Sequence, residues 1–464
     1  MLNTPDICLR TPAILLLLGL AACSNIGDGN STTDAPGTPD AKPDLQNPIW
    51  LQILGSDQND YAHALALAPD GSLYVTGQTE GDYENLPNKG DTTDSNNNTD
   101  ILLSKLNADG ARMWHRTLGT STNDLATCLV VDSDGSLVIG GGTLGKLGAD
   151  PNLGGEDAFV ARLDDAGNVI WATHIASRQG ERVSDLTLDR FGNIYALGTS
   201  FGDIDGTTHT GTVDNPDFFI SKISSDGVLL WTVNSGTSKA EFGNKIAINS
   251  KGNLVVIGTT QGNLHGNLNH DTSTDREKST DIFLSTFDPD LRDFLWTLEI
   301  GSIRGDFAYA LAIDNDDNIY IGGNIAVLLD GSRDPEDGMV GVAFIDKYDE
   351  LGTLLWRDEI DQAASGSEFK ALTITAEGNI LAAGNTAGVT LEDLTTASTD
   401  IFIKQYNATG RTQRADLYGG NKIDTVADII SSADGSVYLA GSSNSEFPER
   451  PGLGKYEVLL MGIE

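Results

Sequence analysis

The stretch DAFVARLDDAGNVIWATHIASRQGERVSDLTLDRFGNIYALGTS, residues 157–200, sets the pattern for most of the chain. It holds four short runs rich in apolar and β-branched residues, separated by turn sequences such as Asp165-Ala166-Gly167. Runs of this kind between glycine turns predict β-strands. Six tryptophans repeat the pattern at intervals of 57 to 65 residues: Trp50, Trp114, Trp171, Trp231, Trp296 and Trp356. A strand-and-turn repeat of this length indicates radial repetition of a small sheet.

Seven copies of the repeat can be compared position by position. The first strand of each copy alternates in apolar character, and a tight turn follows it. The second strand ends in a glycine in all seven copies, where we expect a side chain to clash with the neighbouring sheet. These glycines are Gly77, Gly141, Gly198, Gly258, Gly323, Gly384 and Gly441. The tryptophan position holds Arg414 in the sixth copy, and its six tryptophans are interpreted as packing between sheets.

The two ends of the repeat array complement each other. Residues 48–54, PIWLQIL, form a tryptophan strand with no sheet before it, whereas the seventh copy stops at its third strand, YEVLLMGI, residues 456–463. Joining these ends would close a ring and remove the exposed sheet edges. The prediction is therefore an all-β, seven-bladed β-propeller of four-stranded blades over residues 47–464, with its last blade closed by residues 48–54.

The repeat resembles the bacterial SBBP family, which is named for its seven-bladed β-propeller repeats. The residues that carry the resemblance read DAFVARL at 157–163, Gly167 to Trp171, and DGSLYVTG at 70–77. Departures are Asp317 at a turn glycine, Val342 at the acidic start of a third strand, and Arg414. The resemblance spans about residues 48–463 and implies a propeller fold and an exported location. It implies no particular enzymatic activity.

The N-terminus reads as a targeting segment. Residues 1–22 contain Arg10 and a short apolar run, and they end in Leu-Ala-Ala before Cys23, which resembles a bacterial lipobox. The resemblance implies lipidation of Cys23 after removal of residues 1–22, and Ser24 implies the outer membrane, on its periplasmic or its outer surface. An ordinary cleaved signal peptide is the alternative. Residues 23–46 are polar and rich in Gly, Pro and Asp, as in a disordered tether.

Composition narrows the choice of partners. The formal net charge is −38, which argues against nucleic acid and against direct adsorption on anionic lipid. Membrane contact is therefore expected through the lipid anchor only. The remaining internal cysteine, Cys128, lies in a predicted strand and is interpreted as a small buried apolar residue.

Acidic residues recur at two positions of the repeat. The first column precedes the first strand: Asp60, Asp124, Glu181, Glu241, Asp306 and Asp424, with Ser367 as the exception. The second opens the third strand: Asp100, Asp157, Asp217, Asp281, Asp400 and Glu457, with Val342 as the exception. Both columns should lie near one face of the disc, where the long polar loops also emerge. They either form an acidic binding face or accept backbone hydrogen bonds at strand entrances, and recurrence in every blade favours the second interpretation.

Calcium is the only cofactor that the sequence suggests. Asp94, Asn96, Asn98 and Asp100 alternate in one loop, as oxygen ligands that converge on a cation do, although the spacing is not that of an EF-hand. Asp314, Asp316 and Asn318 have a similar spacing within a predicted turn, and His265, His270 and Asp271 share another loop. No nucleophile elbow, phosphate-binding loop or HExxH zinc motif is present.

These observations favour a lipid-anchored binding module without catalysis, whose partner is an envelope protein or a polysaccharide. The acidic, loop-bearing face is the expected contact surface. The alternative is an enzyme on the same scaffold, either a carbohydrate lyase or hydrolase or a quinoprotein-like dehydrogenase. Because shared residues build the blades, a site is expected where copies differ, in the long loops and in the irregular fifth and sixth copies.

Overall fold

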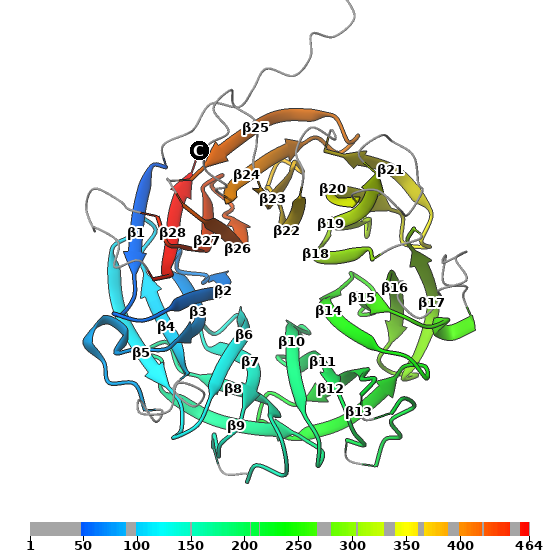
Figure 1. The fold of residues 1–464 in the computed structure, drawn as a ribbon, viewed down its shortest axis with the longest axis horizontal. Coiled ribbons are helices and arrows are strands. Elements are labelled where there is room, and N and C mark those ends of the chain that lie inside the picture. The colour runs from blue at the N-terminus through cyan, green and yellow to red at the C-terminus, as the bar shows by residue number, and fades with distance from the viewer. Residues whose placement is uncertain are drawn as a thin grey trace, which may run out of the picture. The chain divides into compact units, whose positions relative to one another are not determined.

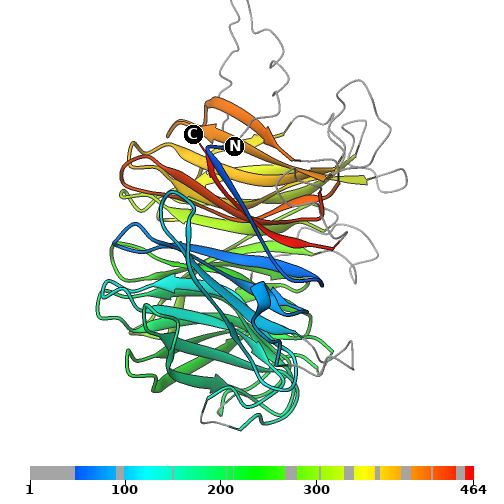
Figure 2. The ribbon, with the colours of Figure 1, turned by 90° about the vertical axis from the view of Figure 1, so that its left-hand side faces the viewer.

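The computed structural model describes residues 48–89, 99–148, 151–204, 206–212, 214–266, 280–302, 305–328, 339–360, 366–387, 399–419, 422–445 and 455–463. These residues form 28 strands in seven antiparallel sheets of four, arranged around a central axis (Figure 1). Seen from the side, the ring of sheets has the shape of a disc (Figure 2). Within the described part of the chain, none of the helical segments has the length and hydrophobicity needed to cross a membrane.

Each blade runs from an innermost first strand to an outermost fourth strand (Figure 1). Blade 1 contains β2 (Asp60–Leu67), β3 (Leu73–Thr79), β4 (Asp100–Leu106) and β5 (Arg112–Leu118), and blade 2 contains β6 (Asp124–Val131), β7 (Leu137–Thr143), β8 (Asp157–Leu163) and β9 (Val169–Ile175). Blade 3 contains β10 (Glu181–Leu188), β11 (Ile194–Ser200), β12 (Asp217–Ile223) and β13 (Leu229–Ser235), and blade 4 contains β14 (Glu241–Ile248), β15 (Leu254–Thr260), β16 (Asp281–Asp288) and β17 (Asp293–Ile300). Blade 5 contains β18 (Phe307–Ile313), β19 (Ile319–Leu328), β20 (Met339–Tyr348) and β21 (Leu354–Glu359). Blade 6 contains β22 (Ser367–Ile374), β23 (Ile380–Ala387), β24 (Thr399–Tyr406) and β25 (Thr412–Tyr418). Blade 7 contains β26 (Asp424–Ser431), β27 (Val437–Ser443), β28 (Glu457–Ile463) and β1 (Trp50–Leu54). Two short 3-10 segments, Tyr83–Asn85 and Leu264–Gly266, follow β3 and β15.

The closure of the ring by the N-terminal strand is confirmed. β1 pairs antiparallel with β28, and the register runs from Trp50 opposite Gly462 to Leu54 opposite Val458. Figures 1 and 2 show the blue β1 beside the red β28. Because the C-terminal strand thereby gains its outer neighbour, blade 7 has four strands like the others. The opening stretch, residues 157–200, accordingly supplies the last two strands of blade 2 and the first two of blade 3.

The hydrophobic core lies between neighbouring blades. One cluster joins Leu103 on β4 of blade 1 to Phe159 on β8 of blade 2, and equivalent clusters follow around the ring. Cys128 is buried in this layer, and burial raises the pKa of its thiol to about 12, so it packs as an apolar residue as expected.

The strand glycines have a different role from the one expected from the sequence. Gly77 lies inside β3 rather than at its end, and it faces a bulge in β2 between Ala62 and Ala64. A Cβ atom on Gly77 would lie 1.9 Å from the carbonyl oxygen of Tyr61, in the same blade and not in the neighbouring sheet. The other six glycines face an equivalent carbonyl, at 1.8 to 2.3 Å. The glycine therefore makes room for the bulge of its own first strand.

The tryptophans pack between blades, which confirms their structural interpretation. The Nε1–H group of Trp114 donates to the carbonyl oxygen of Asp165, in the turn between the third and fourth strands of the next blade. A Cβ atom on Gly167 of that turn would lie 2.8 Å from the Trp114 ring. The same pairing joins Trp50 to Gly110, Trp171 to Gly227, Trp296 to Gly352 and Trp356 to Gly410. The Gly-x-x-x-Trp motif thus takes part in two contacts between blades. Its glycine packs on the tryptophan of the preceding blade, and its tryptophan packs on the glycine of the next blade.

Two faces of the disc are distinguished below. On the loop face, the first strands begin and the connections after the second and fourth strands emerge. On the turn face, each blade carries its two short turns, for example residues 189–193 and 224–228 in blade 3.

Removal of β1 should open the ring. A protein of residues 55–464 would leave β28 as an unpaired edge, and exposed edges favour association. We expect its thermal midpoint to fall by at least about 10 °C relative to residues 47–464, and oligomers to appear in size-exclusion chromatography. A monomer of unchanged midpoint would show that closure contributes little to stability.

Substitution of Gly167 should measure the contact with Trp114. Gly135 and Gly167 have similar positive φ values, 84° and 79°, but only Gly167 has a ring within reach of an added Cβ. Both Gly→Ala variants carry the strain of the left-handed backbone. We expect Gly167→Ala to lower the free energy of unfolding by about 1–3 kcal/mol more than Gly135→Ala, as overpacking does. Equal losses in chemical denaturation would contradict this account of the glycine.

Candidate functional site

The two acidic columns meet at the blade boundaries on the loop face, as expected. Gly119 lies between the members of one pair, because an added Cβ there would be 2.1 Å from Asp100 Oδ1 and 3.3 Å from Asp124 Oδ2. Asp100 belongs to blade 1 and Asp124 to blade 2. The two exceptional positions also meet, since the hydroxyl of Ser367 accepts a hydrogen bond from the backbone N–H of Ala343, next to Val342. Where one carboxylate of a pair is missing, its partner is missing too.

These carboxylates are buried and bind the backbone. Asp60 Oδ2 accepts hydrogen bonds from the N–H and hydroxyl of Ser56, at 2.6 and 2.9 Å. Asp124 accepts the same pair of bonds from Thr120. Asp60, Asp100 and Asp124 have no exposed surface. The structural interpretation of the columns is therefore the better one, because their oxygens are not presented to a partner on the surface.

Burial raises the pKa values of several of these acids. Desolvation is the main cause, and the neighbouring carboxylate of the pair adds to it. The pKa rises to about 6 for four of them, Asp60, Asp100, Asp306 and Asp400. On the fourth strand β17, burial raises the pKa of Glu299 to about 7, with Asp281 nearby. The pKa values of these five acids thus lie between the ordinary range of a carboxyl group and neutrality.

The predicted calcium ligands are only partly within the described residues. Asp94, Asn96 and Asn98 lie outside them, as do Cys23, His270 and Asp271. Asp100 is described, and its Oδ2 atom accepts a hydrogen bond from the backbone N–H of Lys89. Asp314 binds the backbone and side chain of Asn318 within its own turn. Among the described residues, no three His, Cys, Asp or Glu side chains are grouped closely enough to hold a metal ion.

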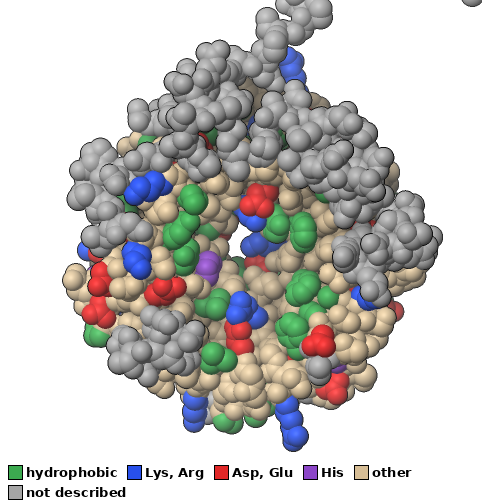
Figure 3. Space-filling model, in the orientation of Figure 1, with side chains coloured by type: hydrophobic (Ala, Val, Ile, Leu, Met, Phe, Trp, Pro, Cys, Tyr) green, Lys and Arg blue, Asp and Glu red, His purple; other side chains and the backbone are tan. Residues whose placement is uncertain are grey.

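The centre of the disc is open, and charged and hydrophobic side chains surround the opening (Figure 3). Side chains at the bulges of the innermost strands bind the next blade. The His63 ring donates to the carbonyl of Ala126 at 2.8 Å, and the amide of Asn244 donates to Ala308. These hydrogen bonds join neighbouring blades around the axis.

Three charged residues break the repeat at the axis. The position that holds Ala or Cys in four blades holds Asp185, Lys245 and Asp428 in blades 3, 4 and 7. Asp185 and Asp428 each accept a hydrogen bond from a backbone N–H of the following blade, and Lys245 Nζ lies 3.5 Å from Asp185. Burial raises the pKa values of both acids, and Asp185 raises that of Lys245. Their contacts are again contacts between blades.

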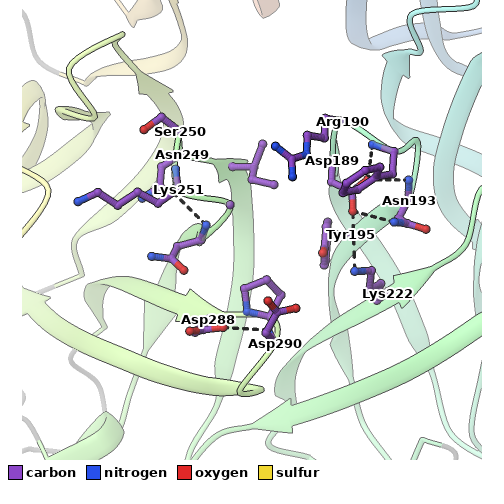
Figure 4. Close-up of a pocket in the computed structure, with 15 residues that line it drawn as sticks. Asp189, Arg190, Asn193, Tyr195, Lys222, Asn249, Ser250, Lys251, Asp288 and Asp290 are labelled. Carbon is purple, nitrogen blue, oxygen red and sulfur yellow. Dashed lines mark hydrogen bonds and ion pairs between the residues drawn. The ribbon is translucent and has the colours of Figure 1, made fainter.

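A groove of about 480 Å³ opens on the turn face between blades 3 and 4 (Figure 4). Turn residues 189–193 of blade 3 and 249–253 of blade 4 form its sides, and Asp288 and Asp290 lie at its outer end. Part of the lining is common scaffold, because Lys222 lies over Tyr195 and near Asp189 just as Lys347 lies over Tyr320 and near Asp314 in blade 5. The remainder is specific to this groove.

Three exposed apolar side chains lie in turns that line this groove or adjoin its lining residues. Phe191 lines it and is 69% exposed, with the Arg190 guanidinium 4.7 Å from its ring centre. Leu291 follows the lining residue Asp290 and is 70% exposed. Leu351 is 74% exposed, and its neighbour Glu350 forms an ion pair with the lining residue Lys251. We call Phe191, Leu291 and Leu351 the apolar triad. Phe191 stands at a turn position that is charged in the other six copies, and this departure from the repeat is the sequence signal that can identify it.

Comparison with known proteins supports the repeat assignment. The family model of the SBBP beta-propeller repeat matches residues 295–329, from the fourth strand of blade 4 through the first two strands of blade 5. The chain contains an SBBP-type repeat. In this part of the SBBP repeat, as in residues 157–200, the sequence unit begins in one blade and ends in the next.

Curated relatives are remote and longer. The regulatory protein FlaEY of Caulobacter vibrioides is 25% identical over 249 residues, which cover 50% of this chain and 24% of FlaEY. An uncharacterized WD repeat-containing protein of Acanthamoeba polyphaga mimivirus is 23% identical over 296 residues, which cover 54% of this chain and 21% of the relative. The chain thus matches less than a quarter of the length of either protein.

Solved structures match this chain at low identity and with TM-scores below 0.5. An ulvan lyase of a polysaccharide lyase family covers 91% of this chain and 95% of its own, with 14% identity and a TM-score of 0.48. Sqt1 of Chaetomium thermophilum covers 89% of this chain and 99% of its own, with 12% identity and a TM-score of 0.42. These likenesses assign no ligand and no activity to this chain.

The boundary acids should make stability depend on pH. A carboxyl group whose folded pKa is raised stabilises the fold below its unfolded pKa, and this contribution is lost as the pH rises through the folded value, here about 6. We therefore expect the free energy of unfolding to be larger at pH 5 than at pH 8. Asp100→Asn should remove about 1–3 kcal/mol of this difference, since one pKa unit corresponds to about 1.4 kcal/mol.

The control for this measurement is Asp109→Asn, which changes an exposed acid in a turn of the same blade. Like Asp100→Asn, it removes one negative charge, but it leaves the buried pair of Asp100 and Asp124 intact. Denaturant titrations at both pH values compare the two variants with the wild type. Equal pH dependence in both variants would assign the effect to overall charge instead of to the buried pair.

Proposed function

We propose that this propeller is a binding module whose groove and apolar triad on the turn face dock a protein partner. The observation that carries the proposal is the exposure of Phe191, Leu291 and Leu351 around one groove, at 69 to 74%. Exposed apolar residues that cluster around a concavity are typical of protein-binding surfaces.

The triad departs from the repeat at every one of its positions. The position of Phe191 holds Asp, Lys or Glu in the other six copies: Asp70, Asp134, Lys251, Asp316, Glu377 and Asp434. The position of Leu291 and Leu351 holds Asp, Ala or Thr in the other copies: Asp109, Ala166, Asp226 and Thr409. A propeller turn therefore needs none of these apolar side chains. Three of them in neighbouring blades are explained by a shared contact and not by the fold.

The charge of the groove also differs from that of the whole protein. Its lining has three basic residues, Arg190, Lys222 and Lys251, against three acidic ones, whereas the chain carries a net charge of −38. A partner with negative charge therefore meets less repulsion here than on the average surface. Arg190 beside Phe191 supplies the pair of residue types that is enriched among interface hot spots.

An aliphatic and aromatic triad of this kind suits a protein partner better than a polysaccharide. Leucine side chains offer no hydrogen bonds to sugar hydroxyls, but they fit apolar side chains of another protein. The sequence signals of an outer-membrane lipoprotein, lipidated at Cys23 and tethered by residues 23–46, suggest that this partner belongs to the cell envelope. The groove on the turn face replaces the acidic loop face as the proposed contact surface.

Photo-crosslinking tests the proposal directly. Benzoylphenylalanine replaces Phe191 in residues 47–464, and in a second protein it replaces Ile170, an equally apolar residue on the outer strand β9 that is 59% exposed. Both proteins are irradiated with the envelope fraction of the source bacterium. We expect one protein to be crosslinked from position 191 and not from position 170.

Affinity for the crosslinked protein then decides the role of the triad. The double variant Phe191→Ala, Leu291→Ala should weaken binding about tenfold or more, as loss of hot-spot residues does, while Ile170→Ala should leave it unchanged. Equal crosslinking from both positions would contradict the proposal, and so would selective binding of envelope polysaccharide that the double variant retains.

A further inference from the structure

Blade 3 contains four buried side-chain atoms that have no hydrogen-bond partner among the described residues. They are the imidazole Nε2 of His209, the carboxylate Oδ1 of Asp217 and the amide Oδ1 of Asn234, together with the hydroxyl Oγ1 of Thr207. The side chain of His209 is 8% exposed and that of Asp217 is fully buried. Buried polar atoms are nearly always paired with protein, water or an ion. Blade 1 also has three unpaired ones among its described residues, so it is the short distance between His209 and Asp217 that indicates a ligand in blade 3.

The atoms of His209, Asp217 and Asn234 come from elements that meet on the loop face. His209 lies in the connection between β11 and β12, Asp217 begins β12, and Asn234 lies on β13 opposite Phe219. His209 Nε2 is 3.9 Å from Asp217 Oδ1, which is too long for a hydrogen bond. Two tetrahedral zinc ligands are roughly 3.4 Å apart, so the histidine would move a few tenths of an ångström toward the carboxylate when both bind one ion. The amide N–H of Asn234 points to the carbonyl of Gly202 at 3.4 Å, so its oxygen faces elsewhere.

In blade 2, the side chain that corresponds to Asn234 has hydrogen-bond partners for its polar atoms. His174 occupies the position of Asn234, and Asp157 that of Asp217. There the His174 Nδ1 atom lies 3.0 Å from Asp157 Oδ2, and its Nε2–H group donates to the carbonyl of Leu147 at 2.9 Å. The side chain next to the carboxylate is thus fully bonded in blade 2. In blade 3, Asn234 is shorter, and a histidine from the loop approaches the carboxylate without making these bonds.

The loop of blade 3 holds its histidine in place through two backbone contacts. The backbone N–H of His209 donates to Asp203 Oδ1, and the N–H of Thr210 donates to Asp217 Oδ2, both at 2.7 Å. The first bond orients the loop, and the second anchors it to the same carboxylate whose other oxygen is unpaired. The imidazole is therefore positioned by the backbone on both sides of it.

We infer that His209, Asp217 and Asn234 bind a divalent cation of the Zn²⁺ type. One imidazole nitrogen and two oxygens favour a cation of borderline hardness over Ca²⁺, which prefers oxygen ligands alone. The third ligand is an amide oxygen, which explains why a cluster of three acidic or imidazole groups is absent here.

The histidine of the site borders a cavity on the loop face. His209, Gly202 and Asp203 line a cavity of about 580 Å³ between blades 2 and 3. A cation held by three protein atoms would keep its remaining coordination position open to this cavity. The site lies on the loop face, opposite the groove of the apolar triad, so the two proposals can fail independently.

Titration with Zn²⁺ tests the inference. Residues 47–464 are treated with chelator, dialysed and titrated with ZnCl₂ in a calorimeter, and thermal unfolding is recorded with and without the metal. We expect one equivalent to bind and the thermal midpoint to rise, because a ligand of the folded state alone stabilises it. Co²⁺ in place of Zn²⁺ should give visible absorption bands typical of a low-coordinate site with a nitrogen ligand.

His265 provides the matched control. It lies in the corresponding connection of blade 4, but its ring nitrogens already contact Ser235 and Thr297 at 2.9 and 2.8 Å. We expect His209→Gln to lose the Zn²⁺ equivalent, the rise in midpoint and the Co²⁺ bands, and His265→Gln to retain all three. Asp217→Asn should weaken Zn²⁺ binding at least tenfold.

The metal-free midpoints of the variants separate misfolding from loss of a ligand. A His209→Gln protein that unfolds at the wild-type temperature without metal has kept its fold. Zn²⁺ binding that is equal in wild type and His209→Gln would reveal an adventitious surface site and overturn the inference. Absence of a saturable equivalent in the wild type would overturn it as well, and would leave His209 and Asp217 as a plain ion pair.

Discussion

The antiparallel pairing of β1 with β28 is the constraint on which the rest of the structure depends. Each blade buries its two faces against its neighbours, so an open array would leave one apolar face exposed at each end. Closure also fixes the geometry of every boundary, because seven identical steps must complete one turn. The tryptophan of one blade can then lie on the turn glycine of the next at five of the seven boundaries, from Trp50 on Gly110 to Trp356 on Gly410. Blade 4 shows that this contact is adjustable: Arg292, with a φ of 56°, takes the glycine position of its turn and lies over Trp231.

Much of this architecture could be predicted, because repetition shows which positions the blade requires. The tryptophans, the closure and the side on which the acidic columns lie all followed from reading equivalent positions across copies. The glycine inside the second strand was assigned to the wrong contact, since its neighbour is the bulged carbonyl of its own blade, such as that of Tyr61. A bulge leaves no clear mark in the alternation of side chains. The exceptions Val342 and Ser367 were noted separately, although they meet at one boundary. Pairing the third strand of each copy with the first strand of the next would have shown them to be a single exception.

The candidate sites were harder to predict for a physical reason. A binding residue that breaks the repeat is visible in the sequence, as Phe191 is, but its exposure and its neighbours depend on the fold. Leu291 and Leu351 lie in turns that are 60 residues apart in the chain. The ring connects both turns to the lining of the groove, one through Asp290 and the other through the Glu350–Lys251 ion pair. The atoms of His209, Asp217 and Asn234 come from a loop and two strands, and the spacing of the three residues resembles no metal motif. The expectation of a site in the fifth and sixth copies stays a prediction, although blades 3 and 4 contribute most of the residues in both proposals.

The division between scaffold and site follows from what each position must do for the ring. Buried carboxylates such as Asp60 and Asp124 accept hydrogen bonds from backbone donors at their own blade boundaries, so these two belong to the scaffold. The charged residues at the axis bind the next blade and are equally committed. Exposed turn positions are not constrained by contacts of this kind, since Asp, Lys, Glu and Phe all occur at the position of Phe191. A ring of this kind can therefore change its binding surface by single substitutions in its turns, while the contacts between blades keep the geometry of that surface constant.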